Sequence, residues 1–111
     1  MGRSVGFGPC ALCERELERT FHHLIPRSTH RNRWFRKTFS FEERNTGIDV
    51  CSDCHGAIHR FVPHEKTLGR SFNTVEALLA HPELGAFVAW VSTRGTNRRF
   101  RTRGGRARRK R

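Results

Sequence analysis

Strand-forming segments occupy the first half of the chain. Residues 20–25 (Thr-Phe-His-His-Leu-Ile) are rich in β-branched and aromatic side chains and are stopped by Pro26, which predicts the end of a strand. The polar residues 14–19 before them fit a short strand or the edge of a ribbon. Residues 48–50 fit another short strand that runs directly into Cys51. This half of the chain therefore predicts β-structure next to a cysteine.

Helical patterns dominate the second half of the chain. A helix capped by Ser52 or Asp53 is expected to run to about Phe61, because Pro follows two residues later. Residues 73–76 (Asn-Thr-Val-Glu) fit a capping box, and residues 81–84 (His-Pro-Glu-Leu) predict a further helix with Pro at its first position. The apolar residues expected to face the core are Val75, Leu78, Leu79, Leu84, Phe87, Val88 and Val91, with Trp90 near the same face.

Two segments have no regular period. Residues 1–9 predict a flexible leader. Residues 27–46 are polar and basic, with aromatic residues among them, and fit either a partly packed loop or a short helix. These aromatic residues are Trp34, Phe35, Phe39 and Phe41.

The composition predicts one small domain that needs a staple. The chain has 111 residues, of which 35% are apolar, so its core is small and a metal or disulfides are expected to support it. All four cysteines fall in Cys-x2-Cys pairs, which is the spacing of a zinc site. The chain has no apolar run typical of a signal peptide or a membrane span, so we expect a cytoplasmic protein in a reducing compartment.

The positive charge is concentrated at the C-terminal end. The formal net charge is +12, and residues 94–111 contain ten basic residues and no acidic ones. Such a segment is expected to be a disordered Arg-rich tail with a polyanionic partner, most simply nucleic acid. A solubilising tail or a cloning remnant is the alternative. The tail residues expected to contact nucleic acid are Arg98, Arg99, Arg101 and Arg103.

The two cysteine pairs predict one shared structural zinc ion. Cys10 and Cys13 are separated by 37 residues from Cys51 and Cys54. Each pair presents two thiolates from one turn, and zinc prefers four such ligands in a tetrahedron. Binding would close the intervening chain and contribute to folding. The alternatives are reduced cysteines packed as small apolar residues, two disulfides, or a site that pairs Cys51 and Cys54 with His59.

Four histidines predict a second metal site. His55 and His59 are four residues apart and share one face of a helix. His22 and His23 are adjacent, so an irregular backbone is expected if both serve one site, because neighbours on a regular strand point to opposite faces. Three imidazoles around a metal leave positions for water and phosphate, and a fourth can accept a proton. A second structural zinc site is the alternative. We interpret the remaining histidines, His30, His64 and His81, as ordinary surface or core residues.

These residues resemble a known family. His22-His-Leu-Ile-Pro26 together with Cys51-x2-Cys-His-x3-His59 resembles the HNH endonucleases, members of the ββα-metal (His-Me finger) nucleases. The resemblance spans about residues 10–61, and residues 62–93 more weakly resemble the C-terminal helices of small bacterial members. It implies an α+β fold: an HNH nuclease domain over residues 10–93 and the basic tail over residues 94–111. The domain is expected to have a small ββα-metal core of two antiparallel strands and one helix, stapled by a four-cysteine zinc site, with C-terminal helices.

The resemblance also implies roles for individual residues. His23 matches the general base that activates water. The middle letter of the motif is an asparagine whose usual place, nine residues before the helix histidine, is held here by Thr46. Asn45, one residue earlier, is the expected replacement. The matching ligands of the catalytic metal are His22, His55 and His59.

The implied function is that of a metal-dependent endonuclease. The resemblance implies hydrolysis of DNA phosphodiester bonds, by nicking or double-strand cleavage, with Mg²⁺, Mn²⁺, Ni²⁺ or Zn²⁺ as the catalytic ion. Duplex DNA is the expected partner, RNA is an alternative one, and a bacterial or phage origin is expected. A non-catalytic zinc-stabilised nucleic-acid-binding module is the alternative function. The basic residues that follow the base, and that either contact phosphates or form a merely solvated loop, are Arg27, Arg31, Arg33, Arg36 and Lys37.

Overall fold

The computed structural model describes residues 3–95 of the chain. Most of the predicted tail, including the four arginines expected to contact nucleic acid there, lies outside these residues. The elements in chain order are β1 (Ser4–Pro9), β2 (Glu16–His23), the 3-10 helix η1 (Arg27–Thr29), α1 (Arg33–Thr38), α2 (Phe41–Arg44), β3 (Gly47–Cys51), α3 (Ser52–Phe61), α4 (Glu65–Ser71), α5 (Val75–Ala80) and α6 (Pro82–Val91).

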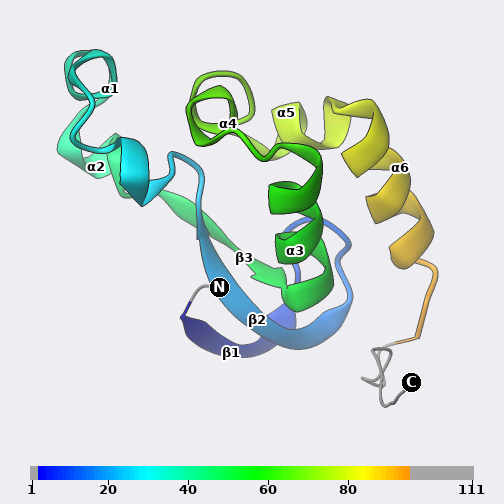
Figure 1. Cartoon of the computed structure of the whole chain (residues 1–111). Helices are drawn as coiled ribbons and strands as arrows, with labels where there is room; N and C mark the ends of the chain where they lie inside the picture. Colours follow the sequence, from blue (N-terminus) through cyan, green and yellow to red (C-terminus); the bar gives the residue numbers. More distant parts are fainter. Residues whose placement is uncertain (1–2, 96–111) are drawn as a thin grey trace.

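The sheet has three antiparallel strands in the order β1-β2-β3. The central strand β2 pairs Thr20 with Val50 and His22 with Ile48 of β3, and α3 packs against the sheet (Figure 1). The α+β class predicted from the sequence is therefore confirmed.

The expectation of a flexible leader over residues 1–9 was wrong for the part that forms β1. This strand has little strand-forming character of its own and is held by pairing with β2. Its register shifts between Ser4 and Gly6, and Gly6 adopts a φ of 93°, a conformation that glycine reaches without strain. Pairing with a strand distant in sequence thus forms β1 in a segment whose local sequence does not predict a strand.

The connection between β2 and β3 contains short helices, which settles the open choice between a loop and a helix. Asn32 caps α1, because its side-chain oxygen accepts hydrogen bonds from the amides of Trp34 and Phe35. Ser40 and Glu43 form a reciprocal capping box at the start of α2. Figure 1 shows both helices on the opposite side of the molecule from α6.

The helix starts differ slightly from those predicted. Cys51, rather than Ser52 or Asp53, caps α3, because β3 runs into the helix without a loop. The sulfur of Cys51 accepts a hydrogen bond from the amide of Cys54. Thr74 caps α5 one residue later than expected. His81 caps α6 with Pro82 at the first position, as predicted. Helix α4 was not predicted from the sequence.

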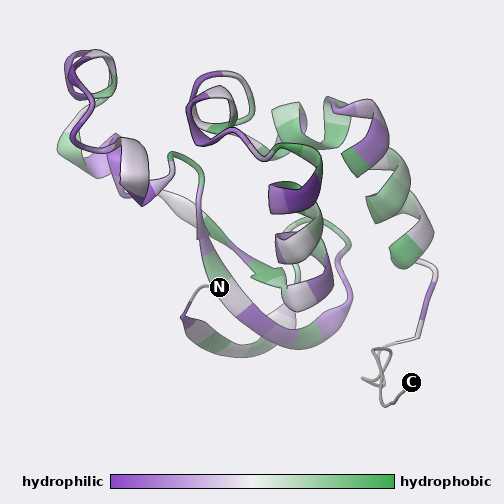
Figure 2. Cartoon of the chain, viewed as in Figure 1, coloured by the Kyte–Doolittle hydropathy of each residue, from purple (hydrophilic) through white to green (hydrophobic). Residues whose placement is uncertain are grey.

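The core lies between the sheet, α3 and the C-terminal helices. Its fully buried side chains include Val50, Ile58, Leu68, Leu78 and Leu84. Figure 2 shows apolar residues gathered on α5 and α6, whereas β2 is largely hydrophilic. Trp90 is 55% exposed and lies outside the buried face predicted for α6. Within residues 3–95, no helix combines the length and the apolar character needed to cross a bilayer.

Candidate metal centres

The four cysteines converge at the junction of the sheet and α3. The β1–β2 connection carries one pair, and the end of β3 with the first turn of α3 carries the other. Their sulfur atoms all lie within 4.8 Å of one another, and all four side chains are buried and free of disulfides. This excludes the two-disulfide alternative. The cluster consists of Cys10, Cys13, Cys51 and Cys54.

The geometry of this cysteine cluster fits a structural zinc ion. Zn–S bonds of about 2.3 Å in a tetrahedron place the sulfurs about 3.8 Å apart, and Cys13 Sγ lies 3.8 Å from Cys51 Sγ. The amides of Leu12 and Cys13 donate to Cys10 Sγ. Hydrogen bonds among the four thiols lower the pKa of Cys10 and raise the pKa of Cys51 and Cys54, because the sulfurs are packed closely enough to share protons. The buried cluster therefore indicates a structural zinc site.

Three of the four predicted histidines also converge. His55 and His59 lie one turn apart on α3 and face His22 on β2. A ring nitrogen of each lies within 4.8 Å of the others, and the ring centroids are 5.2–5.4 Å apart. We call these three residues the histidine cluster. Their arrangement can hold a metal ion.

The environment of His22 supports this interpretation. Its Nε2 atom is buried and has no hydrogen-bond partner among the described residues. Burial, followed by the neighbouring His55 and His59, lowers the pKa of His22 to about 3, so the ring is neutral at physiological pH. A neutral imidazole with an unpaired buried nitrogen is stabilised when that nitrogen binds a metal ion.

Thr20 orients His55. The Thr20 hydroxyl donates to the Val50 carbonyl (3.4 Å), and its oxygen lies 2.7 Å from His55 Nδ1. With the hydroxyl hydrogen directed to the carbonyl, the hydroxyl oxygen can accept Nδ1–H of His55. The lone pair of His55 is then on Nε2, available to a metal. Sequence reasoning missed Thr20, although it lies two positions before His22 on one face of the strand.

His23 lies beside the cluster and outside it. The backbone is a regular strand here, with His22 opposite Ile48 and His23 opposite Gly47. The irregular backbone expected if both histidines served one site is not found, and only His22 belongs to the cluster. Both histidines nevertheless line one cleft of about 740 Å³, which reaches around the end of β2. Besides these two, the cleft is lined by Arg3, Val5, Phe21, Pro26, Arg27, Asn45, His55, His59 and Glu65.

Two rings hold the His23 side chain. Phe21 lies edge-on to it at 4.8 Å, and His30, interpreted from sequence as an ordinary histidine, lies at 5.7 Å. Phe21 itself covers Gly47, where a Cβ atom would collide with the ring. Burial and the positive charges nearby, led by His30 and Arg27, lower the pKa of His23. A neutral imidazole at this position can accept a proton.

Asn45 lies in the same cleft as His23. Its amide nitrogen donates to the Phe41 carbonyl at the start of α2 (2.9 Å). The neighbouring Thr46 carbonyl accepts a hydrogen bond from Leu24, the residue after His23. The segment of Asn45 and Thr46 thus closes the loop that begins at His23, and the motif role of Asn45 stays a prediction.

The basic residues predicted after His23 to bind nucleic acid fall into two groups, those that line the cleft and those that lie on the surface outside it. Only Arg27 among the five that follow His23 lines the cleft. Arg3 also lines it, and sequence reasoning missed this residue because it precedes a segment with no strand pattern. The other four are exposed on the surface between η1 and the end of α1; they are Arg31, Arg33, Arg36 and Lys37.

Comparisons with known proteins add no relative. No protein-family model, no curated protein and no solved structure matches this chain. The functional argument therefore rests on the fold, the two clusters and the cleft.

Proposed function

We propose that this protein is a metal-dependent endonuclease of the HNH type that hydrolyses phosphodiester bonds in DNA. The observation that carries the proposal is the histidine cluster in a cleft that also contains an imidazole outside the cluster, His23. A ligand set of three residues beside an open cleft is typical of catalytic metal sites, whereas structural zinc sites use four protein ligands.

In this proposal the histidine cluster holds one divalent ion. Three imidazoles suit Ni²⁺ or Zn²⁺ better than Mg²⁺, which prefers oxygen ligands. When bound, the ion supplies stabilisation of negative charge on the phosphate oxygens. The hydrogen bond between His55 Nδ1 and Thr20 leaves Nε2 of His55 to bind the ion together with His22 and His59.

His23 accepts the proton of the attacking water in this proposal. Its lowered pKa keeps the ring neutral, and the contacts with Phe21 and His30 restrict its orientation. Arg3 and Arg27 line the same cleft and provide guanidinium groups for a phosphate. The products expected from the resemblance are 5′-phosphate and 3′-hydroxyl ends.

Duplex DNA is the proposed partner. The exposed basic residues after the cleft, Arg31 to Lys37, lie on a segment next to α2 and supply contacts to the phosphate backbone. The excess positive charge beyond Gly95 adds affinity that depends on salt and not on sequence.

Plasmid cleavage by His23→Ala tests the proposal. Wild-type protein with Mn²⁺, Ni²⁺ or Mg²⁺ is expected to nick or linearise supercoiled DNA, and EDTA is expected to stop it. Loss of the general base is expected to slow cleavage by about 10²- to 10⁴-fold, with an unchanged circular dichroism spectrum and DNA affinity. His64→Ala is the matched control, because His64 is exposed and outside the cleft. DNA binding without cleavage under every metal would instead favour the zinc-stabilised binding module.

A further inference from the structure

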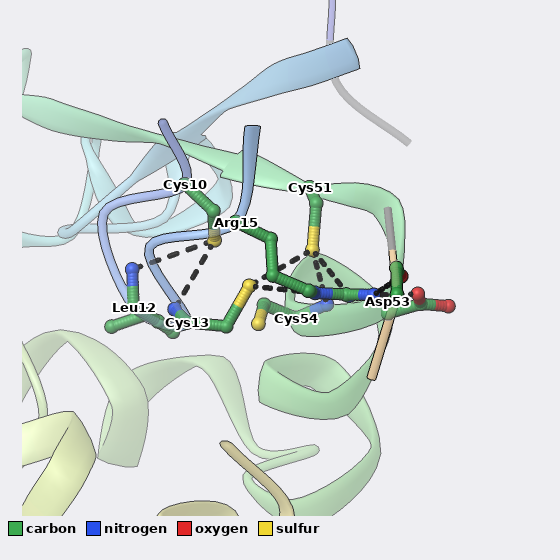
Figure 3. Close-up of polar contacts among 8 residues, drawn as sticks. Cys10, Leu12, Cys13, Arg15, Cys51, Asp53 and Cys54 are labelled. Atoms are coloured by element: carbon green, nitrogen blue, oxygen red, sulfur yellow. Dashed lines mark hydrogen bonds and ion pairs between the residues drawn. The ribbon is translucent and has the colours of Figure 1, made fainter. Parts of the chain in front are cut away.

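A buried arginine lies against the cysteine cluster. Arg15 is only 6% exposed, and Figure 3 shows its side chain running across the cluster toward Asp53. Its Nε donates to Cys13 Sγ at 3.3 Å, and Nη2 donates to Cys51 Sγ at 3.6 Å and to Asp53 Oδ2 at 3.1 Å. Its Nη1 donates to the carbonyl of Gly95 at 3.2 Å. Every guanidinium nitrogen is therefore used.

The local backbone directs Arg15 to this position. Glu14 adopts a φ of 68°, the left-handed conformation, at a cost of about 1 kcal/mol for a residue with a side chain. Two backbone hydrogen bonds close the turn. The amide of Glu14 donates to the carbonyl of Cys10, and the amide of Cys10 donates to the carbonyl of Arg15. The turn that presents the thiolates thus also presents the arginine.

The charge of Arg15 matches a zinc-loaded cluster. A buried guanidinium is stabilised by anionic partners, and Asp53, with its side chain 36% exposed, is one of them. Four thiolates around one Zn²⁺ ion leave two uncompensated negative charges in the interior. Donation from Arg15 to two of the sulfurs offsets part of this charge, and hydrogen bonds to charged acceptors are the stronger ones.

We propose that Arg15 retains zinc in the cysteine cluster and couples the cluster to the C-terminal end of α6. The first part follows from its bonds to Cys13 and Cys51. The second follows from its bond to Gly95, which lies 80 residues away in sequence, at the start of the basic segment. Through this bond the zinc-loaded cluster fixes the position of Gly95, which follows α6 in the chain. This proposal does not depend on the nuclease proposal, because it concerns the other end of α3.

Zinc release from the full-length, zinc-loaded protein tests the first part. Transfer of zinc to a chromogenic chelator is expected to be about 10- to 100-fold faster for Arg15→Gln than for wild type, as for other residues that support metal ligands. Arg15→Lys keeps the charge and is expected to give an intermediate rate. Arg19→Gln is the matched control, because Arg19 lies on the same sheet, pairs with Asp49 and bonds to the carbonyls of Gly6 and Pro9. Its rate is expected within twofold of wild type.

Hydrogen–deuterium exchange of the peptide that spans Ser92 to Gly95 tests the second part. The amides of Ser92, Thr93 and Arg94 are bonded to α6 carbonyls, and they are expected to exchange faster in Arg15→Lys, whose single ammonium cannot reach Gly95 and both sulfurs. Their exchange rates are expected to be unchanged in Arg19→Gln.

A rate of zinc release equal to that of wild type in a folded Arg15→Gln variant would overturn the proposal.

A milder variant keeps the test decisive if Arg15→Gln does not fold. Asp53→Asn removes the carboxylate that orients the guanidinium and leaves all four cysteines in place. It is expected to accelerate zinc release less than Arg15→Gln does. Unchanged release and unchanged exchange in both Asp53→Asn and Arg15→Lys would also overturn the proposal.

Discussion

The two ends of α3 contribute to two different kinds of candidate metal site. At its start, four buried sulfurs surround one point, backbone amides donate to them, and Arg15 covers them. Further along, three imidazoles meet beside a cleft of about 740 Å³ with a histidine outside the set. The first cluster offers four protein ligands and is buried, whereas the second offers three beside a cleft. Ligand number and access, more than the metal itself, distinguish a site that supports folding from one suited to chemistry.

Removing a cysteine is expected to have the largest effect in this comparison. Cys54→Ser leaves a buried hydroxyl and three sulfurs, so zinc binding and the folding energy it supplies, about 10 kcal/mol or more for structural sites, are largely lost. Thermal unfolding by circular dichroism, together with zinc content, measures this. His59→Ala, at the other end of α3, is expected to keep both the zinc and the fold. Equal destabilisation by the two variants would mean that both centres are structural.

Removing the support of a histidine is expected to have a smaller effect. Thr20→Val retains the shape of the side chain and loses the hydrogen bond to His55. We expect the affinity of the histidine cluster for a divalent metal to fall by about 10- to 100-fold, as measured by isothermal titration calorimetry with Mn²⁺ or Ni²⁺. The zinc content of the cysteine cluster is expected to stay unchanged. Thr20→Ser keeps the hydroxyl and is expected to bind as wild type does. If Thr20→Val also binds normally, Thr20 does not set the orientation of His55.

The smallest effect is expected from pH. The pKa of His22 is lowered from 6.5 to about 3 in the folded protein, so between these values the unfolded chain binds more protons and stability falls as pH falls. Between pH 6.5 and 5.5 the free energy of unfolding is expected to decrease by about 1 kcal/mol from this residue alone. Urea unfolding without added divalent metal measures the slope, and His22→Asn is expected to reduce it. An unchanged slope in that variant would show that His22 titrates normally.

Prediction from sequence worked best where the relevant contacts are local. The Cys-x2-Cys turns, the i, i+4 histidines of α3 and the Pro82 start of α6 depend on residues a few positions apart, and the structure has all three. Prediction failed for β1 and for α4. Both are held by partners distant in sequence: β1 by β2, and α4 by contacts with η1 and by the burial of Leu68. Local propensity carries little information about such pairing.

The same division applies to the candidate sites. Sequence alone identified the residues that form the two clusters, because the sulfurs and imidazoles and their local spacings belong to the covalent chain. Tertiary structure decided which groups support them. Thr20 reaches His55 across 35 residues, and Arg15 reaches Gly95 across 80. No local pattern records such pairs, since they arise only when the sheet, α3 and α6 pack together and exclude water from the groups between them.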